Sequence, residues 1–165
     1  MDPIHVKVRI DRPREEVFAY LADVANHSEF SDHYLSHWHL LRIDSFGQGA
    51  GARFRVGAPL QRFDWGDYTL VDVERPQRIV ALGRYGKFNR IKTTGIWTLD
   101  AAPGGGTEVE YMFESEPALP TDRLVESLSG QRRWFKRKLR KAMKRLQSIL
   151  EEDHDRGARI TVAGL

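Results

Sequence analysis

Apolar and polar positions alternate strictly at the start of the chain. In Ile4-His5-Val6-Lys7-Val8-Arg9-Ile10 the even positions are apolar and the odd positions are polar. A period of two is typical of a β-strand with one buried side and one side facing solvent. The same kind of pattern, separated by Gly- and Pro-rich breaks, predicts further strands at 38–46, 53–56, 63–73, 78–84, 91–99 and 107–114.

Helical spacing appears on both sides of these strands. After Pro13, the apolar residues Val17, Phe18 and Leu21 are spaced three or four apart, which predicts a first helix, and a second short helical piece spans about 27–36. A long helix is predicted at about 121–151. Its apolar stripe consists of Leu124, Leu128, Phe135, Leu139, Ala142, Met143, Leu146, Ile149 and Leu150.

This order of elements predicts an α+β fold. A curved antiparallel sheet of six to seven strands, with the long C-terminal helix lying across it, accounts for every segment. Such a sheet offers more apolar surface than one helix can cover, so we expect a space between them in which a small molecule binds. Residues 152–165 are expected to form a flexible C-terminal tail, and we see no repeat and no second domain.

Composition narrows the possible chemistry. The 165 residues suit one domain, and the absence of cysteine excludes disulfides, thiolate metal sites and cysteine nucleophiles. No run approaches about 18 apolar residues, and Met1-Asp2-Pro3 does not open a signal peptide. We therefore expect a cytoplasmic location and no transmembrane segment.

Charge is concentrated in one segment. Nine of the 26 basic residues, and no acidic residue, lie between Arg132 and Arg145, whereas the rest of the chain is acidic. Two interpretations stay open. These residues form either the solvated face of the last helix or a surface for weak contact with an anionic membrane or nucleic acid. Trp134, about 120° from the centre of the apolar stripe, either lies exposed among these cations or packs against the short helices or a partner chain.

Several motifs resemble one known family. The segment from Pro13 to Asp23, with two acidic residues, Val-Phe and Leu-x-Asp, is similar to the opening helix of the START-like (SRPBCC) superfamily. The glycine-rich turn 47–51, the Glu-Arg-Pro turn 74–76 and Trp97-Thr98-Leu99 followed by three glycines match in order. The resemblance covers about residues 3–150 and implies a helix-grip domain over 1–151. Its members include polyketide cyclases, lipid-transfer proteins, coenzyme Q-binding proteins and ligand sensors.

The resemblance leaves the function open. It implies a cavity between the sheet and the long helix for a lipid-like, aromatic or polyketide-like molecule. A small-molecule binding protein is our first hypothesis, and a polyketide cyclase/aromatase-like enzyme is the alternative. No cofactor or metal is expected, because the glycine-rich segments join strands and no nucleotide loop is present. A homodimer stays open.

Polar residues on the predicted inner face are the main candidates for chemistry. If Phe63 and Val73 point inward, then Trp65 and Asp67 do so too. Three roles stay open for Asp67 with Arg84: the pair orients a polar ligand group, stabilises an enolate, or forms a structural salt bridge. Helical geometry turns Gln131 and Arg132 toward the sheet, where Arg132 suits a carboxylate or phenolate. Asp67 and Arg132 are the catalytic candidates.

Aromatic and histidine side chains complete the candidate site. Trp65, Tyr85, Trp97, Tyr111 and Phe135 either line the cavity or belong to the plain core. The histidines His33, His37 and His39 allow a weak metal site with Asp32, ordinary surface positions, or hydrogen bonding and acid–base work at the cavity mouth. We assign His33 and His37 to ligand binding.

Overall fold

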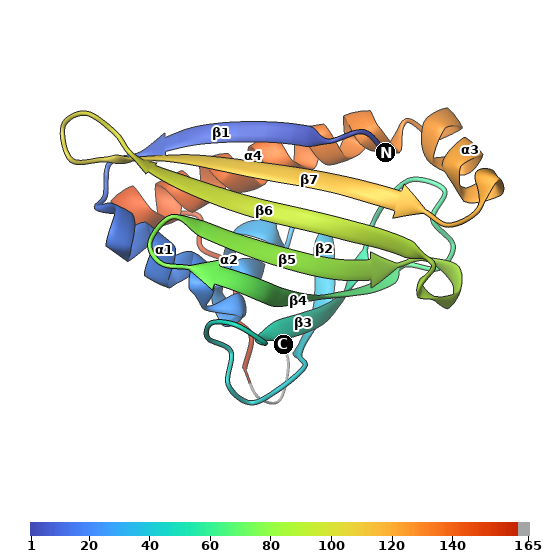
Figure 1. Ribbon diagram of the computed structural model, residues 1–165, viewed down its shortest axis with the longest axis horizontal. Helices are drawn as coiled ribbons and strands as arrows, with labels where there is room; N and C mark the ends of the chain where they lie inside the picture. Colours follow the sequence, from blue (N-terminus) through green and yellow to red (C-terminus); the bar gives the residue numbers. More distant parts are fainter. Residues whose placement is uncertain (162–165) are drawn as a thin grey trace.

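Seven antiparallel strands form one sheet in the order β1-β7-β6-β5-β4-β3-β2 (Figure 1). The structure is a computed structural model that describes residues 1–161. Every strand pairs with its neighbour in antiparallel register, and β1 and β2 are the two edges, so the predicted sheet is confirmed. The strands are β1 (Ile4–Ile10), β2 (Leu35–Leu40), β3 (Gly51–Val56), β4 (Trp65–Glu74), β5 (Arg78–Tyr85), β6 (Ile91–Ala101) and β7 (Thr107–Pro117).

The helices cover one face of the sheet. In Figure 1, α4 runs behind β1 and β7, and α1 and α2 lie on the same side of the sheet. This arrangement confirms the expected helix-grip α+β fold. The helices are α1 (Arg14–Ala22), α2 (His27–Ser31), α3 (Pro120–Leu128) and α4 (Gln131–Glu152), with short 3₁₀ turns at Val24–Asn26 and Lys87–Asn89.

The predicted helix over 121–151 is two helices. Ser129 ends α3, and Gly130 takes a left-handed conformation with φ +67° before α4 begins at Gln131. Glycine adopts this conformation without the steric penalty that a Cβ brings. Residues before and after Gly130 therefore do not belong to one continuous stripe.

The predicted strand over 38–46 is also shifted. β2 begins at Leu35 and ends at Leu40, and the chain then forms a loop. Arg42 holds this loop, because its guanidinium donates hydrogen bonds to the backbone carbonyls of Asp44, Phe46 and Gln48. In this loop, hydrogen bonds from the Arg42 side chain to backbone carbonyls take the place of the backbone hydrogen bonds between strands.

A β-bulge changes the face assignment along β4. The register with β5 shifts between Leu70 and Asp72, so that two residues of β4 oppose one step of its partner. Leu70 and Val73 therefore both face the helices, although an unbroken period of two would place them on opposite faces. Before the bulge, the inner positions are Gly66, Tyr68 and Leu70, and the prediction that Trp65 and Asp67 point inward is wrong.

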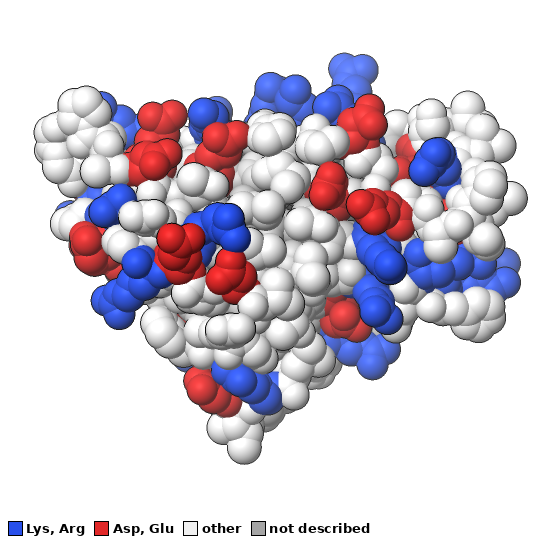
Figure 2. All heavy atoms as spheres, viewed as in Figure 1, with Lys and Arg blue, Asp and Glu red and all other residues white. Residues whose placement is uncertain are grey.

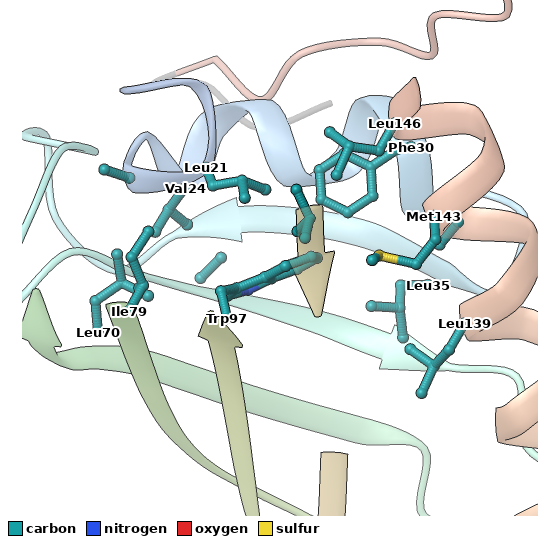
Figure 3. Packing of buried hydrophobic residues seen from close by; sticks show 14 of the residues in the cluster. Leu21, Val24, Phe30, Leu35, Leu70, Ile79, Trp97, Leu139, Met143 and Leu146 are labelled. Carbon is teal, nitrogen blue, oxygen red and sulfur yellow. The ribbon is translucent and has the colours of Figure 1, made fainter. Parts of the chain in front are cut away.

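The core lies between the sheet and the helical layer. Figure 3 shows Trp97 projecting from β6 toward Phe30 of α2 and Met143 of α4, with Leu139 and Leu146 beside them. The rings of Phe30 and Trp97 meet edge to face, with their centroids 6.1 Å apart. These contacts fasten α2 and α4 to the same part of the sheet.

Residues 153–161, expected within the flexible tail, instead pack against α2 as a strap. The backbone N–H of Gly157 bonds to the carbonyl of Glu29 at 2.8 Å, and that of Ile160 bonds to the carbonyl of Ala25 at 3.0 Å. The side chain of Ile160 is buried in the core. Residues 162–165 of the predicted tail lie outside the described residues, and the domain boundary at 151 stays a prediction.

Candidate functional site

A cavity of about 100 Å³ lies between the sheet and the layer made by α2 and α4. Its walls include Phe30 of α2, Met143 of α4 and Trp97 of β6. A cavity of ~150 Å³ lined by apolar side chains is known to hold benzene, so this space is on the scale of a single aromatic ring. The cavity is partly open, so a larger molecule can extend out of it or move its walls apart.

Small residues leave this part of the sheet uncovered. Gly66, Ala81, Gly83 and Gly95 take inner positions on β4, β5 and β6. A Cβ added to Gly95 would lie 3.2 Å from Cε2 and Cζ of Tyr111, so that phenol ring rests directly on the glycine. The absence of side chains at these positions creates the space and places the Tyr111 ring in its wall.

A histidine and a tyrosine form a hydrogen-bonded pair in the wall. Nε2 of His27 lies 2.7 Å from the carbonyl oxygen of Leu21, and Nδ1 lies 2.5 Å from the hydroxyl of Tyr68. A carbonyl only accepts, so Nε2 carries the proton. Burial lowers the pKa of His27 to about 4, which keeps the ring neutral at pH 7. Nδ1 therefore accepts, and the Tyr68 hydroxyl donates to it.

Two further phenols line the cavity. Tyr34 follows α2, and Tyr111 projects from β7. Burial raises the pKa of both hydroxyls, and the neighbouring Tyr111 raises that of Tyr34 further. Neither hydroxyl makes a hydrogen bond within residues 1–161. Each is a neutral donor that a bound molecule can use.

Of the two interpretations of the aromatic candidates, the structure shows that Tyr85, Trp97, Tyr111 and Phe135 line the cavity, while their role in ligand binding stays a prediction. Burial raises the pKa of Tyr85, whose hydroxyl lies near Ser115 and Glu126 but has no hydrogen-bond partner within residues 1–161. This places it at the end of the cavity nearest α3. The four residues come from three strands and α4, and their aromatic surface forms much of the wall.

The predicted charged pair lies on the other face of the sheet. Asp67 and Arg84 are register partners on β4 and β5, and their neighbours Tyr68 and Gly83 take the inner positions. The two residues border the cavity through the backbone, because their carbonyl oxygens lie close to where Cβ atoms on Gly83 and Gly66 would be. The part of the cavity that the structure describes is thus lined by uncharged side chains.

The remaining strand and histidine candidates lie outside the cavity. Trp65 is on the outer face, where the guanidinium carbon of Arg53 lies 4.8 Å from its ring centroid. His37 is exposed and bonds the hydroxyl of Ser36 at 3.0 Å. His33 is half-buried on the far side of α2, with Nε2 3.1 Å from the carbonyl oxygen of Lys138. Among the described residues, no three metal-ligating side chains come together.

The candidates at the start of α4 point elsewhere. Gln131 is buried, and its amide donates to the carbonyl of Pro59 at 3.1 Å. Arg132 is exposed and donates to the carbonyl of Pro3 at 3.2 Å, beyond the edge strand β1. Gln131 therefore contacts the loop between β3 and β4, whereas Arg132, the next residue along α4, points toward the start of β1 and does not reach the cavity. Trp134 packs edge to face on Tyr34 at 6.1 Å.

His27, Tyr34 and Tyr68 were missed from the sequence. Helical spacing of four and seven places His27, Ser31 and Tyr34 on one face, and this signal was available in the predicted segment 27–36. Tyr68 could be placed only by assigning the even positions of β4 before the bulge to the inner face, and the bulge itself is visible only in the structure.

Comparison with known proteins decides the family. The model of the family described as polyketide cyclase/dehydrase and lipid transport matches residues 1–151. The chain belongs to this family. This confirms the START-like (SRPBCC) resemblance. No curated protein matches the sequence.

Solved structures of similar fold agree with this assignment. TTHA0849 of Thermus thermophilus is 16% identical with a TM-score of 0.66, covering 90% of this chain and 96% of that chain. The KanY protein is 15% identical with a TM-score of 0.70, covering 90% and 96%. DynU16, from the dynemicin biosynthetic locus, is 17% identical with a TM-score of 0.62, covering 95% of this chain and 50% of that chain. At these identities the similarity shows the fold alone.

Proposed function

We propose that the protein binds a neutral, mainly apolar molecule that contains an aromatic ring and carries hydroxyl or carbonyl groups. The observation that supports this is a largely enclosed cavity lined by aromatic and aliphatic side chains, whose polar groups are four phenols, the hydroxyls of Ser31 and Thr93, and one neutral imidazole. Family membership adds support, because the family includes polyketide and lipid ligands in its description.

The polar groups select a pattern of donors and acceptors. The Tyr68 hydroxyl gives its proton to His27, so toward a ligand it acts as an acceptor for a hydroxyl group. Tyr34 and Tyr111 can donate to a ligand carbonyl. A hydroxylated aromatic ketone satisfies both requirements at once.

A charged ligand fits this cavity poorly. Moving a carboxylate out of water is costly unless a cation or several donors receive it. No cationic side chain enters the cavity in the described part of the chain, since Arg84 and Arg132 both lie outside. The suggestion of a carboxylate or phenolate ligand of Arg132 therefore has no support.

A polyketide cyclase-like enzyme is the second candidate, and the hydrogen-bonded pair is the observation that favours it. In such a reaction Tyr68 Oη would accept a proton from substrate carbon while its own proton passes to His27 Nδ1. A conjugate acid with a pKa of about 4 makes His27 a weak base at pH 7. Because so weak a base accepts a proton poorly at pH 7, we favour ligand binding over catalysis as the function.

The experiment combines mass spectrometry with thermal unfolding. Native mass spectrometry of the purified protein should show a retained neutral molecule. Separately, 2-naphthol and hydroxyacetophenones at about 100 times Kd should add about 2.7 kcal/mol of stability, which is roughly 5–10 °C in Tm for a chain of this size. If no neutral aromatic compound in a broad panel raises Tm, the proposal fails.

A variant and a control locate the effect. Tyr111→Phe removes one cavity hydroxyl and should reduce the Tm increase, whereas Tyr20→Phe removes a buried hydroxyl that bonds Glu29 outside the cavity and should leave the increase unchanged. Turnover of a poly-β-keto substrate that disappears in Tyr68→Phe would instead favour the enzyme.

A further inference from the structure

Helix α3 turns its apolar side to solvent and a charged side chain toward the protein. The one residue that it buries is Glu126, which accepts a hydrogen bond from the hydroxyl of Ser115. Its apolar side chains face solvent, with Leu128 78% and Leu124 58% exposed. A helix that packs only against its own domain buries its apolar side, so this outward side indicates a contact with something else.

Two loops present apolar side chains in the same way. Leu60, between β3 and β4, is 78% exposed, and Phe88, between β5 and β6, is 84% exposed. Both have a φ of +57°, a left-handed conformation that is costly for residues with a Cβ. The backbone thus holds strain at the two positions that turn a large apolar side chain to solvent.

These elements gather at one end of the molecule. Lys87 Nζ lies 5.7 Å from the ring centroid of Phe63 and 5.3 Å from that of Phe88, so the two loops adjoin. In Figure 1, α3 and both loops lie at the right-hand end. We call this surface the apolar rim; it consists of Leu60, Phe63, Phe88, Leu124 and Leu128.

The apolar rim adjoins the cavity. Val56 and Tyr85 line the cavity and directly precede the two loops, and Gln131 joins the first loop to α4 through the carbonyl of Pro59. A surface that contacts the rim therefore lies next to that end of the cavity.

Cations surround the rim. Arg62, Lys87 and Arg123 are exposed there, and Arg132 and Arg133 follow in the first turn of α4. Of the nearby carboxylates, Asp64 is paired with Arg55 and Asp122 with Arg90, while Glu116 at the end of β7 is exposed. Figure 2 shows this right-hand end as mostly uncharged surface, with blue Lys and Arg side chains on and below it and red Asp and Glu side chains on its inner side.

We propose that the apolar rim docks on an anionic lipid bilayer. Separate leucine and phenylalanine tips with cations between them suit insertion at the boundary between headgroups and acyl chains, while the cations attract anionic lipid. Within residues 1–161 no helix is both long and apolar enough to cross a bilayer, so the contact is peripheral. This inference goes beyond the proposed function and holds for any ligand in the cavity.

The test is vesicle binding without added ligand. The full-length protein is sedimented with vesicles of phosphatidylcholine alone or of equal parts phosphatidylcholine and phosphatidylglycerol. Binding to the anionic vesicles should exceed binding to the neutral ones at least tenfold and should fall as salt rises. The triple variant Leu60→Ser/Phe88→Ser/Leu128→Ser should lose at least tenfold in binding at unchanged Tm, and Lys87→Glu should reduce it.

Ile43→Ser is the matched control. Ile43 is 81% exposed in the β2–β3 loop, at the other end of the sheet, and its replacement should leave vesicle binding unchanged. Equal binding by the triple variant would overturn the proposal, as would no binding to either vesicle. So would light scattering that shows a wild-type dimer and a monomeric triple variant, because the rim would then be a self-association surface. Ligand binding to the cavity is measured separately, so the two proposals can fail independently.

Discussion

The two sides of helix α2 are both covered, but they carry opposite kinds of polar chemistry. On the cavity side lie His27, Phe30 and Ser31, with no ionised group among them. On the strap side, Glu29 accepts hydrogen bonds from the Tyr20 hydroxyl and from Arg156, each at 2.5 Å. Asp32, which ends the helix, pairs with Arg145.

This contrast distinguishes a binding site from a structural contact. On the strap side every one of these charged groups has a partner in the chain, so nothing is left for a ligand. On the cavity side the hydroxyl of Tyr85 is buried without a hydrogen-bond partner within residues 1–161, and the hydroxyls of Tyr34 and Tyr111 make no hydrogen bond there either. The space beside these three hydroxyls is hollow. Unused donors beside free volume indicate where a ligand belongs.

The largest predicted effect concerns pH and the cavity side. The pKa of His27 is about 4 in the folded protein and about 6.5 when unfolded, so the unfolded chain binds more protons between these values. The stability contribution is complete above pH 6.5 and is lost as pH falls toward 4, by about 3 kcal/mol. Urea unfolding at pH 7 and pH 4 measures it.

His27→Gln should flatten this dependence relative to wild type, and His39→Gln, an exposed position, should not. The carboxylates that titrate in the same pH range are the same in all three proteins, so their contribution to the pH dependence of stability cancels in the comparison. Parallel curves for wild type and His27→Gln would mean that this histidine is not buried in neutral form.

On the strap side, Arg156→Ala should cost about 2 kcal/mol of unfolding free energy. Removing one partner of a buried ion pair costs ~3–5 kcal/mol, and the partial exposure of Arg156 lowers that figure. Ligand affinity should change little, because the cavity side is untouched. Chemical denaturation measures the change in unfolding free energy, and titration calorimetry measures the change in ligand affinity. A large loss of affinity at unchanged stability would mean that the strap side binds the ligand and the cavity side does not.

A smaller effect is expected inside the cavity. Tyr111→Phe should weaken binding of a ligand that carries a carbonyl group by about 1 kcal/mol, or roughly fivefold, since one hydrogen bond is lost. Gly95→Ala should act through the same group, because the added methyl displaces the Tyr111 ring. An unchanged Kd in both variants would remove Tyr111 from the site.

The smallest effect belongs to the residues that the sequence suggested for catalysis. Asp67→Asn and Arg132→Ala should leave ligand affinity unchanged and alter stability by less than about 0.5 kcal/mol, because both side chains lie outside the cavity. A tenfold loss of affinity in either variant would contradict the placement of the site.

The sequence predicted the fold and the aromatic wall because regular periods carry that information. The alternation along β6 and β7 placed Trp97 and Tyr111 correctly. It could not place Asp67, since the bulge after Leu70 changes the phase of β4 without leaving a mark in the pattern. The predicted direction of Arg132 was wrong for a related reason. Gly130 divides the predicted helix in two, so an angle measured on one continuous helix does not apply, and Arg132 points to Pro3 beside β1.

The most direct test compares one ring system in two charge states. At pH 7, calorimetric titration of the wild-type protein with 2-naphthol and with 2-naphthoate measures how the cavity treats a neutral hydroxyl and a carboxylate. An uncharged lining predicts that 2-naphthol binds at least tenfold more tightly. Removing two of the unpaired hydroxyls in Tyr34→Phe/Tyr111→Phe should weaken 2-naphthol binding and so reduce the ratio of the two affinities. Equal or tighter binding of 2-naphthoate to the wild-type protein would contradict the account.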